Sequence, residues 1–391
     1  MYHEEALTLL HWLAYARSPP TLAELVDAAI IDLDEEGSID TNERGGLRDA
    51  LNILFGLVTI EENHSNGEGN DSETETSTSD VSTAGPEQGG AMFHSEHLTA
   101  DTRVRLAHFS VKEYLESDRI LESPAGHFYL ESATGHRFLA QSCFTYLQVY
   151  SASCEKTFTR RDLETFPLLR YAAESWFYHS TLQSGDEVSG ETSLLHLEHL
   201  RDSWLLIHDP DKSWIKPFIR HKYKGTGRVA GSAIYYASLL GLLVVVTKLL
   251  YNGANVDAEG GEYGSPLEAA SARGHKEIVQ LLLNKGAKVD KVGGRYGGPL
   301  QAASAGGHKE IVQLLLDKGA NVNVEDEGHG SPLQAASAGG HKETVQLLLD
   351  KGANVNAVGG WDGSALQAAS SRDHKEIVQL LLNVITRHNA R

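Results

Sequence analysis

The carboxyl-terminal part of the sequence repeats one pattern of apolar and polar positions every 33 residues. The string His-Lys-Glu begins at His275, His308, His341 and His374, and three of these copies continue as the identical nonamer HKEIVQLLL. Apolar residues occupy most of the nonamer, so it predicts a helix that neighbours must cover on more than one side. Self-similarity at this fixed period indicates a repeat array.

A second, shorter helix is predicted upstream of each nonamer. Ser265 precedes Pro266, and these residue types suit the N-cap and the first position of a helix. Gly286 follows the nonamer helix, at the place where a left-handed residue commonly ends a helix. Counting back 33 residues from Pro266 reaches a degenerate unit. We therefore predict five helix pairs over residues 232–385, joined by glycine-rich turns.

These units resemble the ankyrin repeat, which has a period of 33 residues and the signature Thr-Pro-Leu-His-x-Ala. Here the signature reads Ser-Pro-Leu-Glu-Ala-Ala at 265–270 and Ser-Pro-Leu-Gln-Ala-Ala at 331–336. The resemblance implies a mostly α-helical solenoid. The replacement of the signature histidine calls its usual loop hydrogen bonds into question, but not the fold. The residues that replace it are Glu268, Gln301, Gln334 and Gln367.

Both end units are expected to be atypical, because each has one face without a neighbouring repeat. The first unit has Leu242-Leu243-Val244 where later units have His-Lys-Glu, and this extra apolar surface predicts packing on the segment before it. The last unit ends in Arg387-His388-Asn389-Ala390-Arg391, a polar tail suited to capping.

The residues before the array predict two further regions. Residues 1–120 are predicted to be a winged-helix-like module, and residues 121–228 a helical neck and linker, followed by the repeats at 229–391. The stretch 61–100 contains nine acidic residues and no Lys or Arg, so we expect a disordered insert. Trp176, Trp204 and Trp214 are expected in the core. Helices are predicted over 6–16, 22–31, 47–55, 138–150, 168–179 and 194–206, and strands over 57–60 and 104–109.

A second resemblance extends over nearly the whole chain. It rests on ALTLLHWLAYARSPPTLAELVDAAIIDLD at 6–34, VRLAHFSVKEYLES at 104–117, FPLLRYAAESWFYHS at 166–180 and GSAIYYASLLGL at 231–242. These stretches are similar to the region after the ATPase in fungal NACHT–ankyrin proteins, relatives of the STAND and NLR-like receptors of heterokaryon incompatibility and innate immunity. The resemblance implies the partner-sensing half of such a protein. The sequence contains no Walker A, Walker B or sensor segment, and a true absence and a truncated gene model both stay open.

Composition narrows the classes of function. The chain has 34 Lys and Arg against 53 Asp and Glu, a net charge of −19, which argues against nucleic acid or an anionic membrane as the main partner. The third predicted helix offers only Arg44 and Arg48 for a nucleic-acid role, which stays an unfavoured alternative. The longest apolar run, Ala237–Val246, is too short for a membrane span.

The chemistry-bearing residues point away from catalysis. Cys143 and Cys154 are the two cysteines, too few for a disulfide framework or a cysteine zinc site, and they fit a cytoplasmic or nuclear location. Histidines placed once per repeat do not converge on one metal ion. Because no catalytic triad, paired-carboxylate motif or phosphate loop is visible, we expect no enzyme, no cofactor and no metal. A nucleotide-dependent enzyme is the other unfavoured alternative.

The predicted partner is another protein, bound through the turns between units. Packing residues repeat along the array whereas the turns differ, and aromatic residues and Arg are typical of interface centres. In a competing interpretation of equal weight, Tyr263 and Tyr296 only pack on the adjacent loop. The sequence identifies neither the partner nor the oligomeric state. The candidate residues are Glu262, Tyr263, Arg295, Tyr296, Glu325, Asp326, His329, Trp361 and Asp362.

Overall fold

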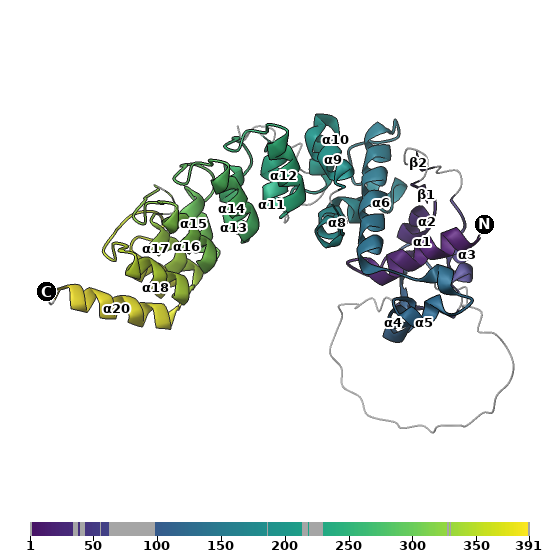
Figure 1. Ribbon diagram of the computed structural model, residues 1–391, viewed down its shortest axis with the longest axis horizontal. Helices are drawn as coiled ribbons and strands as arrows, with labels where there is room; N and C mark the ends of the chain where they lie inside the picture. The colour runs from purple at the N-terminus through teal and green to yellow at the C-terminus, as the bar shows by residue number, and fades with distance from the viewer. Residues whose placement is uncertain are drawn as a thin grey trace, which may run out of the picture. The chain divides into compact units, whose positions relative to one another are not determined.

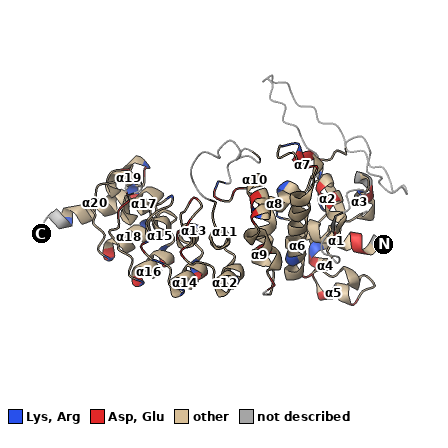
Figure 2. Ribbon diagram, turned by 90° about the horizontal axis from the view of Figure 1, so that it is seen from above, with Lys and Arg blue, Asp and Glu red and all other residues tan. Residues whose placement is uncertain are grey.

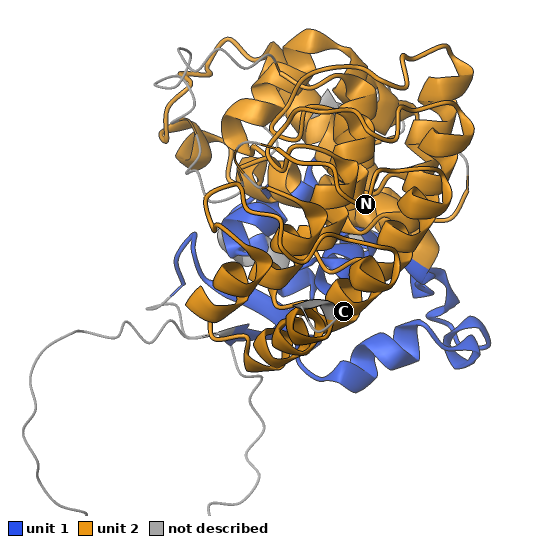
Figure 3. Cartoon of the chain, turned by 90° about the vertical axis from the view of Figure 1, so that its left-hand side faces the viewer, with its two compact units in different colours: residues 1–32, 40–132 blue, residues 33–39, 133–391 orange. Residues whose placement is uncertain are grey.

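The computed structural model describes residues 2–33, 38–39, 44–54, 56–61, 98–185, 187–212, 218, 230–326, 328 and 330–389. The chain divides into two compact units, one of residues 1–32 and 40–132 and one of residues 33–39 and 133–391 (Figure 3). Most of the predicted acidic insert, residues 62–97, lies outside the described residues. The described part is mostly helical, as predicted (Figure 1).

The first unit contains three helices followed by a two-stranded antiparallel hairpin. Strands β3 and β4 pair Val58 with Leu106 and Glu61 with Arg103. The three predicted helices and both predicted strands are confirmed, with ends shifted by a few residues. The elements are α1 (Tyr2–Tyr15), α2 (Leu22–Ala29), β1 (Ile31–Asp32), α3 (Leu47–Ile53), β3 (Val58–Glu61), β4 (Arg103–Leu106), α4 (Phe109–Leu115), α5 (Asp118–Leu121) and the 3-10 helix η2 (Gly126–Phe128).

Local chemistry explains the position of α2. The Glu24 N–H donates to Thr21 Oγ1 at 3.2 Å, and the Thr21 N–H donates to Glu24 Oε2 at 2.7 Å, which forms a capping box at the helix start. Arg44 forms an ion pair with the buried Asp27, with 2.7 Å between Nε and Oδ1. This guanidinium is therefore engaged inside the unit.

The second unit begins with the neck. The one helix predicted over 194–206 is wrong, because Leu197 has extended backbone angles (φ −76°, ψ 113°) and separates two helices. The break lets Leu195 and Leu200 both reach the core. The elements are β2 (Ser38–Ile39), α6 (Ser132–Ala152), α7 (Asp162–Thr165), α8 (Leu169–Leu182), α9 (Ser189–His196) and α10 (Glu198–Ile207).

The neck core contains two of the three tryptophans predicted there. Trp176 and Trp204 are fully buried, and their rings meet edge to face with 5.4 Å between centroids. Trp214 lies outside the described residues. Trp204 also meets Tyr236 of the first repeat at 5.7 Å between ring centroids, so the neck core continues into the array.

The rest of the second unit is a row of five helix pairs, as the period predicts. The first helices of successive pairs lie side by side (Figure 1). The pairs are α11 (Ala233–Leu239) with α12 (Leu243–Tyr251), α13 (Pro266–Arg273) with α14 (Lys276–Asn284), α15 (Pro299–Ala305) with α16 (Lys309–Asp317), α17 (Pro332–Gly339) with α18 (Lys342–Asp350), and α19 (Ala365–Ser371) with α20 (Lys375–Asn389).

The predicted helix ends are confirmed in the internal pairs. Ser265 Oγ accepts a hydrogen bond from the Glu268 N–H at 3.2 Å at the start of α13. Gly286 has φ +90°, a left-handed conformation that favours glycine just past a helix end. In the last pair Ile385 occupies the position of this glycine, and α20 continues to Asn389.

The repeated histidines connect each pair to the one before it. Their Nε2 atoms lie 2.9–3.2 Å from a main-chain carbonyl oxygen near the end of the preceding first helix, as His308 does with Ala272 and His341 with Ala305. Gly274 faces the ring of His308, and a Cβ there would lie 2.7 Å from the ring. These imidazoles therefore join repeats. Within the described residues, no cluster of His, Cys, Asp and Glu is placed to hold a metal ion.

The first pair is atypical in a different way from the one predicted. Leu242, which replaces the histidine, is buried, but Leu243 and Val244 keep exposed fractions of 39% and 37%. Contact with the neck involves α12 as well as α11 with its tyrosines. Among the described helices, none combines the length and the apolar character that crossing a membrane requires.

Candidate protein-binding surface

Four turns project between successive helix pairs, and we call them tips. Tip 1 is residues 259–264, tip 2 is 291–297, tip 3 is 325–330, and tip 4 is 358–363; residues 327 and 329 of tip 3 lie outside the described part. Short antiparallel bridges close tips 2, 3 and 4, at Gly293–Gly297, Asp326–Gly330 and Val358–Ser364. Each of these three tips is thus a small closed loop held at its base.

Side chains at the position of the signature histidine form hydrogen bonds with the main chain of the next tip. In the first pair Tyr235 stands there, and its hydroxyl oxygen accepts the Tyr263 N–H at 3.1 Å. In the second pair Glu268 Oε1 accepts the Tyr296 N–H at 3.1 Å. Gln334 Nε2 donates to the carbonyl oxygens of tip 4. Tyr235, Glu268 and Gln334 therefore make loop hydrogen bonds at this position, whereas the buried Gln301 Nε2 has no hydrogen-bond partner among the described residues.

A buried aspartate ties tip 1 to the end of the neck. Asp211 accepts hydrogen bonds from the Tyr235 hydroxyl and, at 3.2 Å, from the Glu262 N–H. Burial raises the pKa of Asp211 to about 6, although the hydrogen bond from Tyr235 opposes the shift. Arg273 adds a hydrogen bond to the Pro210 carbonyl oxygen at 3.1 Å. These contacts confirm that the first repeat packs on the segment before it.

Two tyrosines predicted as partner-binding residues stack on each other. The rings of Tyr263 and Tyr296 lie 6.0 Å apart with an interplanar angle of 20°. Tyr263 is only 5% exposed, and its ring packs on the adjacent tip, as the competing interpretation expects. Tyr296 is half-buried, and the Arg295 guanidinium lies over its ring at 5.8 Å.

The charged candidates have several internal partners. Glu262 is half-buried and lies 3.6 Å from Lys212 as an ion pair. Asp326 accepts the Gly328 N–H at 2.9 Å, and Glu325 beside it is exposed. Asp362 forms an ion pair with Arg372 at 3.1 Å. His329 lies outside the described residues.

Tip 4 presents an exposed aromatic side chain. Trp361 is 79% exposed, and its main-chain N–H donates to the Gly328 carbonyl oxygen at 2.9 Å, which fixes tip 4 against tip 3. Val358 in the same tip is 74% exposed and Val292 in tip 2 is 63% exposed. Neither valine was among the residues predicted from the sequence. Their signal was an apolar residue directly before a glycine pair, as in Val292-Gly293-Gly294.

The first helices add little to this surface. Helices α15 and α17 contain no charged residue and are entirely tan in Figure 2. Residues Pro299–Ser304 of α15 are buried between their neighbours. Next to α15 and α17, the side chains available to a partner therefore come from the tips.

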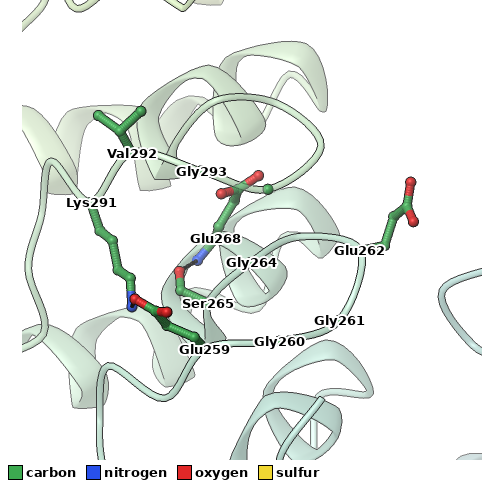
Figure 4. A pocket seen from close by; sticks show the side chains of 11 residues that line it. Glu259, Gly260, Gly261, Glu262, Gly264, Ser265, Glu268, Lys291, Val292 and Gly293 are labelled. Atoms are coloured by element: carbon green, nitrogen blue, oxygen red, sulfur yellow. Dashed lines mark hydrogen bonds and ion pairs between the residues drawn. The ribbon is translucent and has the colours of Figure 1, made fainter. Parts of the chain in front are cut away.

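A groove of about 570 Å³ opens between tips 1 and 2. Five glycines of the two tips contribute to its walls, at positions 260, 261, 264, 293 and 294. Figure 4 shows Glu268 reaching toward Gly293 in the middle of the groove, and Glu259 beside Lys291 at one side. Lys291 Nζ lies 3.4 Å from Glu259 Oε1 and donates to the Asp257 carbonyl oxygen at 2.7 Å.

A known protein family and a known protein are similar to this chain, the first over the repeat array and the second over about two thirds of the chain. The family model described as ankyrin repeats (3 copies) matches residues 234–326 and again 300–391. A protein of Monascus ruber, described as azaphilone pigments biosynthesis cluster protein L, is 33% identical over 277 residues. That alignment covers 68% of this chain and 51% of the relative, so the chain spans about half the length of the curated relative it matches. Neither finding names a NACHT ATPase.

The matched segment and the structural repeats coincide. The match begins inside α11 and runs to the end of the chain, over the five helix pairs with their glycine helix ends and histidine bridges. The carboxyl-terminal part is an array of ankyrin repeats, and the chain is an ankyrin-repeat protein.

Proposed function

We propose that this chain is a non-catalytic binding protein that holds another protein along the tips of its ankyrin repeats. The observation that carries the proposal is the exposed pair Trp361 and Val358, fixed on a closed tip by the hydrogen bond to Gly328. Tryptophan is enriched among the few residues that dominate binding energy at interfaces. A rigid tip also reduces the conformational entropy lost when a partner binds.

The contrast between constant helices and variable tips supports the same role. The nonamer helices are nearly identical, whereas the tips read GGEYG, GGRYG, DEGHG and GGWDG at corresponding positions. In a solenoid, the repeated residues maintain stacking between neighbours. Side chains that differ from one tip to the next can therefore encode recognition of a particular partner. We propose no catalytic role and no cofactor for this surface.

The experiment replaces the anchor on tip 4. A partner is first captured by cross-linking to the full chain in a cell lysate, identified and purified. Its affinity is then measured by calorimetry with Trp361→Ala and with the control Tyr251→Ala, since Tyr251 is 88% exposed at the end of α12 and away from the tips. We expect Trp361→Ala to weaken binding by about tenfold or more and the control to have no effect. Equal affinities of the two variants would contradict the proposal.

A finer proposal concerns the residues before the array. We propose that the first unit is a winged-helix-like module that packs on protein, and that the chain serves as the sensing part of an NLR-like receptor in the cytoplasm or nucleus. Three helices followed by the β3–β4 hairpin support the module, and the resemblance at 6–34 and 104–117 supports the receptor. The Arg44–Asp27 ion pair disfavours a DNA-binding role for this unit.

A NACHT ATPase encoded with this chain or associated with it is the expected companion. Sequencing the transcript and the genomic region upstream of Met1, together with the captured partners, tests this expectation. A Walker A motif in frame or in a partner would support the receptor role. If no nucleotide-binding domain is found in either place, the receptor role is wrong, while binding by the tips is unaffected.

A further inference from the structure

We propose that the groove between tips 1 and 2 receives a lysine or arginine side chain from a basic segment of the partner. This inference rests on the proposed protein-binding function and names the chemistry of what is bound. It is carried by the groove itself, by the carboxylate of Glu268 inside it, and by the charge of the tips around it.

The dimensions of the groove suit a long side chain. Its volume of about 570 Å³ lies within the range of pockets that bind small ligands. Glycine walls leave the groove open at its sides, so an extended segment can lie across the two tips. Val292 at the edge is 63% exposed and offers apolar contact to the methylene stem of Lys or Arg.

Glu268 is the unusual residue in the groove. It is 1% exposed, and the equivalent positions of the next three repeats hold the neutral amides Gln301, Gln334 and Gln367. A glutamine oxygen would accept the Tyr296 N–H as well as the carboxylate does, so packing does not require the charge. Burying a carboxylate costs free energy that burying an amide does not. A cation in the groove would be attracted to the carboxylate of Glu268, whereas it would gain much less beside a neutral amide.

The surrounding charge favours the same ligand. Among the residues that line the groove, Glu259, Glu262 and Glu268 are acidic and Lys291 is basic. Lys291 is already engaged by Glu259 and the Asp257 carbonyl oxygen. An acidic or phosphorylated segment would meet mainly repulsion here, whereas a basic segment would be attracted. A second basic side chain could stack on the exposed indole of Trp361.

The test uses random nonapeptides displayed on phage and selected against the immobilised full chain. Selected peptides are synthesised, and their dissociation constants are measured by fluorescence anisotropy with the unmodified chain, Glu268→Gln and Trp361→Ala. Glu268→Gln is isosteric and introduces the residue that three neighbouring repeats already contain, so we expect an unchanged melting temperature. Each peptide is also made with its basic residue replaced by norleucine, which keeps most of the apolar stem and removes the charge.

We expect Lys or Arg to be enriched at one peptide position. Glu268→Gln should weaken binding about tenfold, and the norleucine peptide should lose about the same factor with the unmodified chain but little more with Glu268→Gln. If Glu268→Gln lowers the melting temperature, Glu259→Gln at the exposed edge replaces it, with an expected loss of about threefold.

Two other results would overturn the inference in different ways. Peptides without a basic residue, or with affinities that neither glutamate variant changes, would exclude the cation site. If Trp361→Ala still weakened those peptides, the proposed binding function would stand. If no tip variant affected any selected peptide, both the inference and the proposed function would be wrong.

Discussion

The two ends of the ankyrin array use the same repeat position in different ways. At the first end, Tyr235 is fully buried and joins Asp211 of the neck to the main chain of tip 1. At the last end, the equivalent Gln367 is exposed and accepts the Ser364 N–H of its own helix at 2.8 Å. Inside the array Gln334 caps its own helix and also donates to tip 4, whereas at Gln367 the described contacts are those of the cap.

The apolar surface differs between the ends as well. Leu242 at the first end is buried, whereas Leu382 at the last end is 40% exposed and Leu366 is half-buried. Leu333, the internal counterpart of Leu366, is buried by the next pair, whereas the internal counterparts of Leu382, such as Leu349, are half-buried. Stability should therefore fall from the neck-bound end toward α20, because interface energy is a large part of the stability of each repeat.

The largest effect is expected from removing a leucine inside the array. Leu315→Ala leaves a cavity at a fully buried position and should cost about 2–5 kcal/mol. Leu382→Ala at the last end should cost less than about 1 kcal/mol, because the side chain is already partly in water. Urea unfolding, monitored by circular dichroism, measures the change in the free energy of unfolding for both variants. A cost below about 0.5 kcal/mol at Leu315 would show that the internal repeats are no better packed than the end.

A pH-dependent effect is expected from Asp211 at the first end. Because the pKa of Asp211 is raised to about 6 in the folded chain, the folded state binds its proton more tightly than the unfolded state does. Its contribution to stability is complete below about pH 3.8 and is lost as the pH rises through 6. The loss should be at most about 3 kcal/mol.

The variant Asp211→Asn removes this titration and serves as the control. We compare its melting temperature with that of the unmodified chain from pH 4 to pH 8. Burial lowers the pKa of His275. Its contribution to the stability of the fold is therefore lost as the pH falls below 6.5, opposite to the contribution of Asp211. His275 is present in both proteins, and the difference between the two curves isolates Asp211. A difference that does not fall with rising pH would contradict the assignment.

A smaller effect is expected from the hydroxyl that joins neck and tip. Tyr235→Phe removes the hydrogen bond to Asp211 and leaves the Tyr263 N–H without its acceptor, which should cost about 2 kcal/mol. Gln367→Ala at the other end removes only an exposed cap and should cost about 0.5–1 kcal/mol. Thermal unfolding of the two variants measures how the two losses of stability compare. Equal costs would mean that the neck adds nothing to the first repeat.

The smallest effect should come from restoring the missing glycine at the last end. Ile385→Gly places a helix-ending residue where the other nonamer helices have one, so α20 should end near residue 384. We expect a loss of about 1 kcal/mol or less in stability. Hydrogen exchange of the peptide that covers residues 383–389 should become faster. Unchanged protection would show that the segment is held by something other than its own helix.

The regular part of this fold could be predicted from the sequence. The 33-residue period determined five helix pairs, and Ser265 and Gly286 determined their ends, because caps and left-handed glycines act within a few residues of the chain. The burial of Leu315 could also be predicted, because it lies on the apolar face of a nonamer helix that neighbouring helices must cover.

The rest depends on partners distant in sequence. Tyr263 and Tyr296 occupy the same place in near-identical tips, yet only Tyr263 is buried, and its ring contacts both the stacked Tyr296 and the guanidinium of Arg273. Asp211 stands in a short turn with no periodic pattern around it. The break at Leu197 likewise follows from how two apolar stretches share one core.

The histidine bridges have a consequence for how this array can change in length. Each bridge reaches a carbonyl 36 residues earlier, and the residues that flank the bridge are nearly the same at each junction. Excising residues 276–308 would join His275 directly to Lys309 and recreate the sequence of an existing junction. Whole units can thus be gained or lost by recombination between their coding segments, and such events would bring different tips next to one another while the stacking stays intact.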